Sequence, residues 1–153
     1  MLKDIIIDRH AMPEVLGYPD KITVIGDDSL ILYHDVCRSG PNPFRPSDRK
    51  PWRDVYALVA PGELTWEWYD SPSRGPCLLL NNGGKIPTVN PNFNHDNLNV
   101  ASWVEIHAGQ ASGWPGSTAC VTIPLVGWSA FIGLFAAGDK GKLRIVDKMG
   151  VAA

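Results

Sequence analysis

The chain has 153 residues, which is enough for one domain with a sizeable hydrophobic core but short for two. Hydrophobic residues make up 44% of the chain and charged residues 20%, the balance of a globular protein. A net charge of −2 gives no electrostatic basis for binding nucleic acid or an anionic membrane, and no apolar run reaches the roughly 18 residues of a membrane span. We therefore expect a single domain over residues 1–153, with no nucleic-acid partner and no membrane span.

The first third of the chain predicts short strands separated by turns. Residues 4–8 (DIIID) predict a short buried strand, and residues 21–36 predict a hairpin that turns at Gly26-Asp27-Asp28. Residues 38–54 contain four prolines and no hydrophobic period, so we expect a long exposed loop there.

The middle of the chain predicts a second hairpin over residues 55–70, turning at Pro61-Gly62, with apolar side chains alternating along its second strand. Residues 77–82 (CLLLNN) predict a buried strand, and residues 88–99 are polar and irregular. A sugar-stacking face is one interpretation of the six tryptophans, Trp52, Trp66, Trp68, Trp103, Trp114 and Trp128. Alternating tryptophans in a hairpin are more commonly core residues, and we prefer the core interpretation.

The last third of the chain predicts a strand over residues 101–109 and a second strand that begins within residues 117–128. A helix over residues 128–138, ending at Gly138, and a final strand over residues 142–149 follow. Thirteen prolines and fifteen glycines, spread along the chain, also favour short strands and turns over long helices. The expected fold class is mostly β: a single-domain β-sandwich or mixed sheet with one short helix.

The cysteines and histidines do not predict a metal site. The chain has three cysteines, so at least one thiol has no intrachain partner. No two cysteines form a C-x-x-C pair, and the four histidines are not at metal-ligand spacings. We expect no metal and no cofactor.

The first ten residues (MLKDIIIDRH) do not predict a signal peptide, because charged residues flank only three isoleucines. The expectation is synthesis in the cytoplasm, with any export by a route that this segment does not encode.

One histidine and one cysteine, His107 and Cys120, lie thirteen positions apart on either side of a loop of small residues. A thiolate attacks carbonyls far better than a thiol, and imidazole is the usual group that takes the thiol proton. Small residues before Cys120 (GSTAC) leave backbone amides free to stabilise an oxyanion. The pair predicts acyl transfer through a cysteine whose pKa is depressed, so that it alkylates quickly below pH 7.

At these residues the sequence resembles the L,D-transpeptidases of the YkuD type. That family carries a His-Gly element, a glycine-containing loop, and Ser-x-Gly-Cys followed by an aliphatic residue and arginine. The counterparts are "IHAG" (residues 106–109) and "STACV" (residues 117–121). Small relatives in phages and secreted antibacterial effectors also share an upstream Pro-Gly hairpin, present as "APGELTW". The resemblance covers roughly residues 22–124.

The resemblance implies an enzyme that acts on the stem peptide of peptidoglycan, at a carbonyl next to a centre of the meso-diaminopimelate type. Cys120 would form a thioester, His107 would act as general base, and Ser117 would line the site. The substrate-binding positions would be Ala119, Thr118, Gly109 and Trp114. An amine acceptor would give a cross-link or amino-acid exchange, and water would give carboxypeptidase or endopeptidase activity.

Two residues depart from the family pattern: Ala119 stands for its glycine and Thr122 for its arginine. Arg38 and Lys85 are the candidates to replace that arginine in recognising a substrate carboxylate. Several roles stay open. Ser117 is either a site residue or a turn former, and Glu105 either orients the imidazole or forms a surface pair. Cys37 and Cys77 are expected to be buried or idle thiols.

The alternative is a non-catalytic structural or binding module of a phage particle or secretion apparatus that keeps the fold. For the enzyme, the absence of a leader implies delivery to the periplasm or cell wall through a phage-induced lesion or a contact-dependent secretion machine. Its further partners would then be the delivery machinery or an immunity protein.

Overall fold

The computed structural model describes residues 3–89, 100–112 and 114–150, and within them the chain is mostly β. The strands are β1 (Asp4–Arg9), β2 (Asp20–Ile25), β3 (Ile31–Cys37), β4 (Leu58–Val59), β5 (Gly62–Ser71), β6 (Gly75–Leu80), β7 (Ile86–Val89), β8 (Val100–Ala101), β9 (Glu105–Ala108), β10 (Val121–Ile123) and β11 (Lys140–Asp147). The helices are α1 (Trp52–Val55) and α2 (Leu125–Ile132), with 3₁₀ turns η1 (Asp27–Ser29) and η2 (Asn81–Gly83). The expectation of a β-rich fold with one short helix is confirmed by the large mixed sheet and by α2, since α1 is a single turn. None of the described helices is long and apolar enough to cross a membrane.

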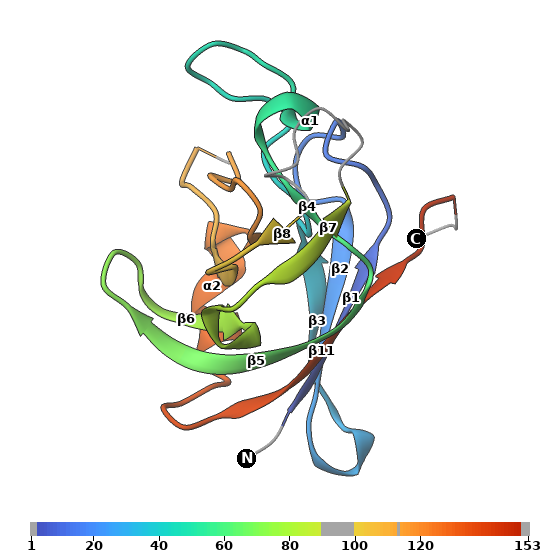
Figure 1. The fold of residues 1–153 in the computed structure, drawn as a ribbon. Helices are drawn as coiled ribbons and strands as arrows, with labels where there is room; N and C mark the ends of the chain where they lie inside the picture. The colour runs from blue at the N-terminus through green and yellow to red at the C-terminus, as the bar shows by residue number, and fades with distance from the viewer. Residues whose placement is uncertain (1–2, 90–99, 113, 151–153) are drawn as a thin grey trace.

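Eight strands form one sheet in the order β10-β9-β6-β5-β11-β1-β2-β3, and β4, β7 and β8 form a smaller one (Figure 1). The β1–β11 and β9–β10 pairs are parallel, while the other neighbours in the large sheet are antiparallel. Beyond the end of β3, Arg38 pairs with Thr122 of β10 through two backbone hydrogen bonds of 2.9 Å. The large sheet therefore curls until its two outermost strands meet at one bridge.

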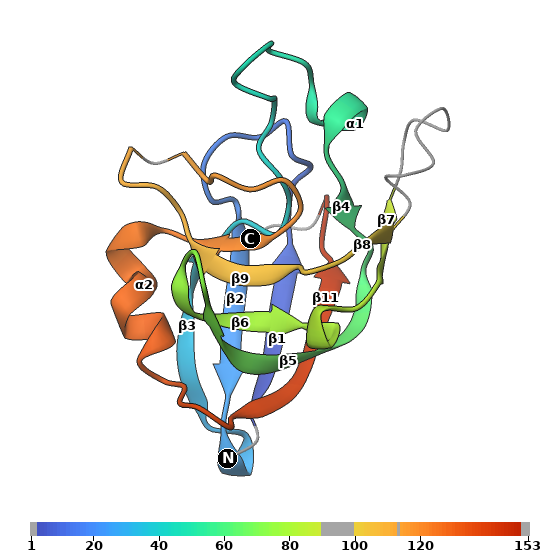
Figure 2. The same cartoon turned by 60° about the vertical axis from the view of Figure 1, so that its left-hand side comes forward.

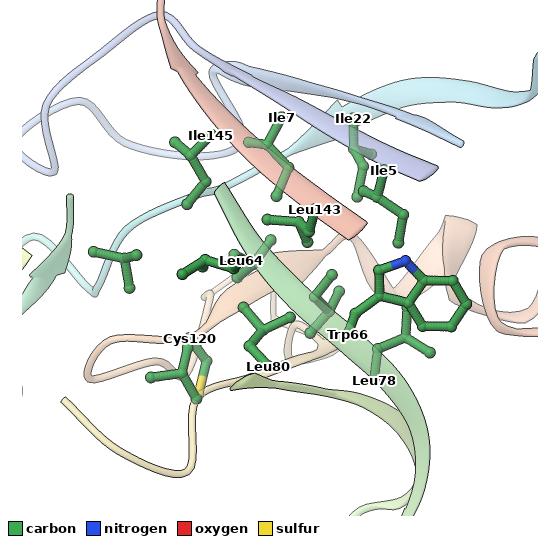
Figure 3. Close-up of a cluster of buried hydrophobic side chains, with 14 of the residues drawn as sticks. Ile5, Ile7, Ile22, Leu64, Trp66, Leu78, Leu80, Cys120, Leu143 and Ile145 are labelled. Carbon is green, nitrogen blue, oxygen red and sulfur yellow. The ribbon is translucent and has the colours of Figure 1, made fainter. Parts of the chain in front are cut away.

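The hydrophobic core lies inside this curl and is built by period-2 alternation. Inward-facing residues of β1, β5 and β11 meet those of β6, as Figure 3 shows for Leu64, Leu80 and Leu143. Each such fully buried aliphatic side chain contributes about 1.5–3 kcal/mol. Helix α2 lies beside β3 (Figure 2) and adds aromatic contacts, with the Phe131 ring 5.4 Å from the Tyr33 ring. Residues 77 and 79 of β6 lie outside this core cluster but are also buried, with 0% and 3% exposed.

The expected hairpin over residues 55–70 is wrong. Strand β4 pairs with β7 in the smaller sheet, whereas β5 pairs with β6 and β11. Pro61-Gly62 therefore marks a passage between sheets, and Gly62 adopts φ +150° there. The hairpin that does form joins β5 to β6 through residues 72–74.

Three other expectations need correction. Residues 38–43 of the expected exposed loop are buried, and residues 52–55 form α1. The strand expected over 101–109 is divided into β8 and β9, because Trp103 between them has φ +56°. The helix expected over 128–138 covers 125–132, directly after Pro124.

The hairpin over 21–36 and the strands at 4–8, 77–82 and 142–149 form within one or two residues of the expected bounds. The segment 88–99, expected to be irregular, belongs to β7 at its first two residues, and the rest lies outside the described residues.

Gly109, immediately after β9, gives a test of the packing around the site. A Cβ atom there would overlap the hydroxyl oxygen of Tyr18, which has no hydrogen-bond partner among the described residues. We expect Gly109→Ala to lower the free energy of unfolding by about 1–3 kcal/mol through overpacking. Tyr18→Phe in the same chain should restore much of that loss, since it removes the overlapping atom. Urea unfolding of the two single variants and the double variant measures the coupling, and purely additive effects would contradict this packing.

Candidate active site

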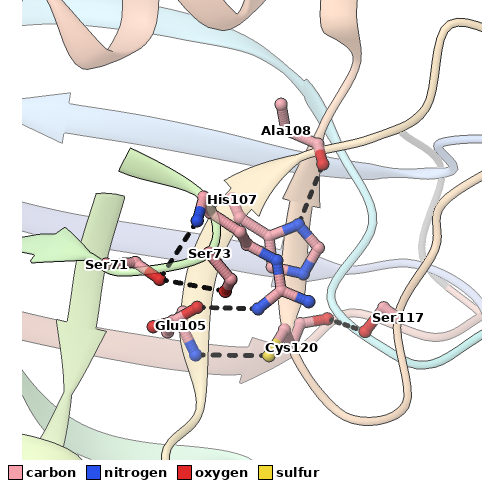
Figure 4. A network of polar contacts seen from close by, with 8 residues as sticks. Ser71, Ser73, Glu105, His107, Ala108, Ser117 and Cys120 are labelled. Carbon is pink, nitrogen blue, oxygen red and sulfur yellow. Dashed lines mark hydrogen bonds and ion pairs between the residues drawn. The ribbon is translucent and has the colours of Figure 1, made fainter. Parts of the chain in front are cut away.

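The parallel pairing of β9 with β10 brings the predicted histidine and cysteine to neighbouring strands. His107 lies in β9 directly opposite Thr122, while Ile106 on the same strand points into the core. Cys120 immediately precedes β10, and extending the β9–β10 register by one residue puts Cys120 opposite Glu105. His107 and Cys120 are thirteen residues apart in sequence, and the loop between two adjacent parallel strands brings them close in space (Figure 4).

His107 has a defined tautomer. Its side chain is buried, with 4% exposed, and Nδ1 lies 2.8 Å from the carbonyl oxygen of Ala108. A carbonyl only accepts, so Nδ1 carries the proton and Nε2 carries the lone pair. Nε2 is buried and has no hydrogen-bond partner among the described residues. Burial, assisted by the charge of Arg74, lowers the pKa of His107 below its ordinary value, so the ring is a neutral base at neutral pH.

Cys120 is also buried, with 9% exposed, and its sulfur accepts a hydrogen bond from the backbone N–H of Glu105 at 3.3 Å. Burial raises the pKa of the Cys120 thiol, and the Glu105 N–H offsets only part of that effect. The expectation of a depressed pKa is therefore wrong for this state of the protein. The resting pair is a neutral thiol beside a neutral imidazole, and not a thiolate–imidazolium pair.

Ser117 supports the backbone of the cysteine and does not contact the histidine. Its hydroxyl donates to the carbonyl oxygen of Cys120 at 2.8 Å, and its N–H donates to the Asn42 side chain at 3.0 Å. The N–H of Asn42 in turn donates to the Ser117 carbonyl at 2.8 Å. Of the two roles left open for Ser117, the geometry is that of a turn-forming residue, which fixes the loop just before Cys120.

Arg74, which the sequence did not single out, is the charged side chain beside His107. It lies in the β5–β6 turn and forms an ion pair of 2.9 Å with the buried carboxylate of Glu105. With 43% of its side chain exposed, it also lines a cavity of about 170 Å³ together with Pro76, His107, Ala108 and Trp128. Glu105 is thus neither a surface pair nor a partner of the imidazole: it holds this arginine over the site.

The two candidates for the missing family arginine are not found at His107. Arg38 is buried and donates to the carbonyl groups of Pro13, Val15, Gly17 and Pro41, all within 3.2 Å. Its guanidinium donors are occupied by hydrogen bonds to the backbone of two loops. Lys85 is exposed, between η2 and β7, and lines none of the cavities at the site. Thr122, at the family arginine position, is buried with its hydroxyl unpartnered among the described residues.

The four expected substrate-binding residues have different surroundings. The backbone N–H groups of Ala119 and Cys120 have no acceptor among the described residues, as an oxyanion site requires. The carbonyl of Thr118 accepts from the N–H of Ala57 at 3.2 Å. Gly109 makes room for Tyr18, as described above. Trp114 packs against Phe44, with ring centroids 5.1 Å apart and 54° between the ring planes, and lines a different cavity from His107.

The other two cysteines are buried, as expected, and unbridged. Burial raises the pKa of Cys77 to about 12, and the nearby Glu105 carboxylate adds to the shift. Burial also raises the pKa of Cys37 well above its ordinary value. Within the described ranges, no group of three or more His, Cys, Asp and Glu side chains is arranged to hold a metal ion.

The lowered pKa of His107 predicts a pH effect on stability. The unfolded chain binds a proton at the ordinary pKa of 6.5, whereas the folded chain resists it. The contribution of the neutral ring is therefore complete above about pH 6.5 and is lost as the pH falls through that value toward the lower folded pKa. We expect His107→Gln to lose less unfolding free energy than the wild type between pH 8 and pH 5, measured by urea unfolding. His34→Gln, at an exposed position of β3, serves as the control. An equal loss in wild type and His107→Gln would contradict the burial of a neutral imidazole.

Comparison with known proteins gives a similarity in fold only. No family model matches the chain, and no curated protein does. Among solved structures, the chain is similar to Bd1075 of Bdellovibrio bacteriovorus, with a TM-score of 0.50 and 15% sequence identity. The similarity covers 93% of this chain and 47% of that one, so the chain spans about half the length of Bd1075.

Proposed function

We propose that the chain is a cysteine-dependent acyl transferase or hydrolase of the L,D-transpeptidase type that acts on peptidoglycan stem peptides. The observation that carries the proposal is the unpartnered, unprotonated Nε2 of buried His107, one strand away from the Cys120 thiol. A buried polar atom without a partner is costly, and such atoms persist where a ligand or a reacting group supplies the partner. The resemblance of the "IHAG" and "STACV" segments to the family supports the substrate class.

In the first half of the reaction, Nε2 of His107 takes the proton of the Cys120 thiol as the sulfur attacks the carbonyl carbon of the stem peptide. Because both groups start neutral, proton transfer accompanies the attack and no standing thiolate is needed. The negative charge moves to the carbonyl oxygen, where the free N–H groups of Ala119 and Cys120 stabilise it. Collapse breaks the peptide C–N bond, and His107 returns its proton to the departing amine, which leaves a thioester.

In the second half, an acceptor amine or water attacks the thioester carbonyl. His107 again accepts the proton of the attacking group, and the sulfur leaves as the thiol once it receives that proton. An amine acceptor yields a new peptide bond, and water yields a carboxylic acid. Substrate of this kind is found in the bacterial cell wall, which is where we propose that the enzyme acts.

Arg74 supplies the positive charge that a stem-peptide carboxylate needs. It is partly exposed, it borders the cavity next to His107, and its pairing with Glu105 fixes the orientation of the guanidinium. Guanidinium groups bind carboxylates through two parallel N–H donors, a geometry that lysine does not reproduce. We assign to Arg74 the role that an arginine at position 122 has in the family.

The alternative function is a non-catalytic binding module with the same fold. It is favoured by the closure of the site, since both Cys120 and His107 are more than nine-tenths buried. Breaking the Arg74–Glu105 pair would leave a buried carboxylate without its partner, because only 7% of the Glu105 side chain is exposed. For the enzyme, substrate therefore has to approach through the cavity that Arg74 and His107 both line, with this ion pair in place.

A product assay tests the nucleophile. Incubation with purified muropeptides carrying stem tetrapeptides, followed by mass spectrometry, should reveal exchanged, cross-linked or trimmed stems. We expect Cys120→Ala to lower product formation by at least about a thousandfold. Cys77→Ala, which removes the other buried thiol near Glu105, should retain activity and is the matched control. Equal activity of Cys120→Ala would contradict the assignment, and a folded wild type without products would favour the binding module.

The role of Arg74 predicts a selective effect on substrate binding. Arg74→Lys keeps the charge opposite Glu105 but loses the forked donors, so KM should rise about tenfold with a smaller change in kcat. Amidation of the stem carboxylate should raise KM for the wild type and have little further effect on Arg74→Lys. An unchanged KM in Arg74→Lys, or additive effects of the two changes, would contradict carboxylate recognition by this residue.

A further inference from the structure

Trp103 is held on the surface in an unfavourable backbone conformation. Its φ of +56° lies in the left-handed region, which costs a residue with a side chain about 1–2 kcal/mol. Even so, 60% of the side chain is exposed, so burial of the indole returns only part of that cost. The backbone N–H of Trp103 donates to the Gly83 carbonyl at 3.2 Å. Two of its ring carbons lie 3.0 Å from where a Cβ of Gly83 would be, so the indole is seated on that glycine.

A second aromatic ring adjoins this indole. The Tyr69 ring lies 6.2 Å from that of Trp103, centroid to centroid, with an angle of 44° between the two planes. Tyr69 belongs to β5 and Trp103 precedes β9, so the pair joins two segments that are 34 residues apart. The Trp103 ring rests on backbone with the partly buried Tyr69 ring tilted beside it, so the pair presents an aromatic surface to solvent mainly through Trp103.

A cavity of about 500 Å³ is lined by residues close in sequence to those that hold the aromatic pair, although neither ring lines it. It is lined by Asp4, Thr65, Trp66, Glu67, Asn82, Lys140, Gly141 and Lys142. Two links connect it to the rings: Glu67 is two residues from Tyr69 on the same face of β5, and Asn82 adjoins the Gly83 on which Trp103 rests. The β5–β11 register puts Lys140 opposite Glu67 and Lys142 opposite Thr65, so these four side chains share the same face of the sheet.

The lining selects a class of ligand. Its two acidic and two basic side chains balance, so neither an anion nor a cation is favoured, and most of the surface that lines the cavity is apolar. A flat apolar surface bordered by hydroxyl, amide and charged groups fits a neutral ring that has one apolar face and many polar substituents. A sugar ring with an N-acetyl group has this character.

We propose that Trp103, Tyr69 and this cavity form a subsite for neutral N-acetylated amino sugars, which holds the glycan while the stem peptide reaches Cys120. The strand register puts this cavity and the candidate active site on the same side of the sheet, because Glu67 pairs with Leu79 of β6 and Leu79 pairs with Glu105 of β9. The choice of glycan rests on the proposed function, since the stem peptide of peptidoglycan is attached to such sugars.

Binding of a β-1,4-linked N-acetylglucosamine tetramer tests the subsite. The full chain carrying Cys120→Ala is titrated with the tetramer, and separately with a sugar-free stem tetrapeptide, while NMR follows the indole N–H signals. We expect the tetramer to shift the Trp103 signal. Trp103→Gly should weaken binding at least about tenfold, because it removes the ring that stacks on the sugar. Glycine adopts a positive φ without strain, so this variant is expected to stay folded.

Two further variants sharpen the test. Trp103→Tyr keeps an aromatic ring and should retain most of the affinity, whereas Val126→Ala removes an exposed apolar side chain on α2 and should have no effect. Failure of the tetramer to bind, unchanged affinity in Trp103→Gly, or a Trp103 shift caused only by the peptide would each overturn the subsite. The assay does not use the thiol, so an inactive protein that binds the tetramer would refute the proposed reaction and leave the subsite standing.

Discussion

The two backbone hydrogen bonds between Arg38 and Thr122 are the contact on which the geometry of the site depends. Strand β10 has only three residues and would otherwise be a free edge of the large sheet. With the bridge in place, it is held on one side by β9 and on the other by the chain that leaves β3. Because Cys120 directly precedes β10 and His107 faces Thr122, the closure of the sheet fixes Cys120 relative to His107.

The Arg38 side chain reinforces the same region at an electrostatic cost. Burial lowers the pKa of this guanidinium, and the buried charge is compensated by backbone carbonyls of two loops and, at longer range, by Asp20. Carbonyl dipoles can stabilise a buried cation without a carboxylate in direct contact when several converge on it. The arginine thereby organises the residues around Pro13 and Pro41 that surround the loop before Cys120. Its role is structural, and Arg74 is left as the cation available to a ligand near His107.

The sequence predicts that His107 and Cys120 come close together better than it predicts what surrounds them. His107 and Cys120 can be found because a strand, a glycine-rich loop and a small-residue segment are local features. Arg74 is not indicated by the sequence, because its position depends on the β5–β6 turn, whereas the predicted hairpin turns at Pro61-Gly62. The conformation of Trp103 depends on Gly83, twenty residues away, so no local pattern indicates it. Pro124, by contrast, directly precedes the observed start of α2 and would have corrected the expected bounds of that helix. The sequence predicts a depressed pKa for Cys120, whereas burial raises it, because burial depends on the assembled core and not on the local segment.

The position of β11 has a consequence for how the chain acquires its structure during synthesis. This last strand lies in the middle of the large sheet, between β5 and β1, and its partner β1 is the first strand of the chain. The ribosome therefore releases both halves of the sheet before the strand that joins them exists, and folding is completed only after residue 147 has emerged. Long-range pairing of this kind folds slowly and leaves apolar strands exposed in the meantime. The edges of β5 and β1 that pair with β11 have no partner strand during that interval, and unpaired strand edges are templates for pairing with other chains.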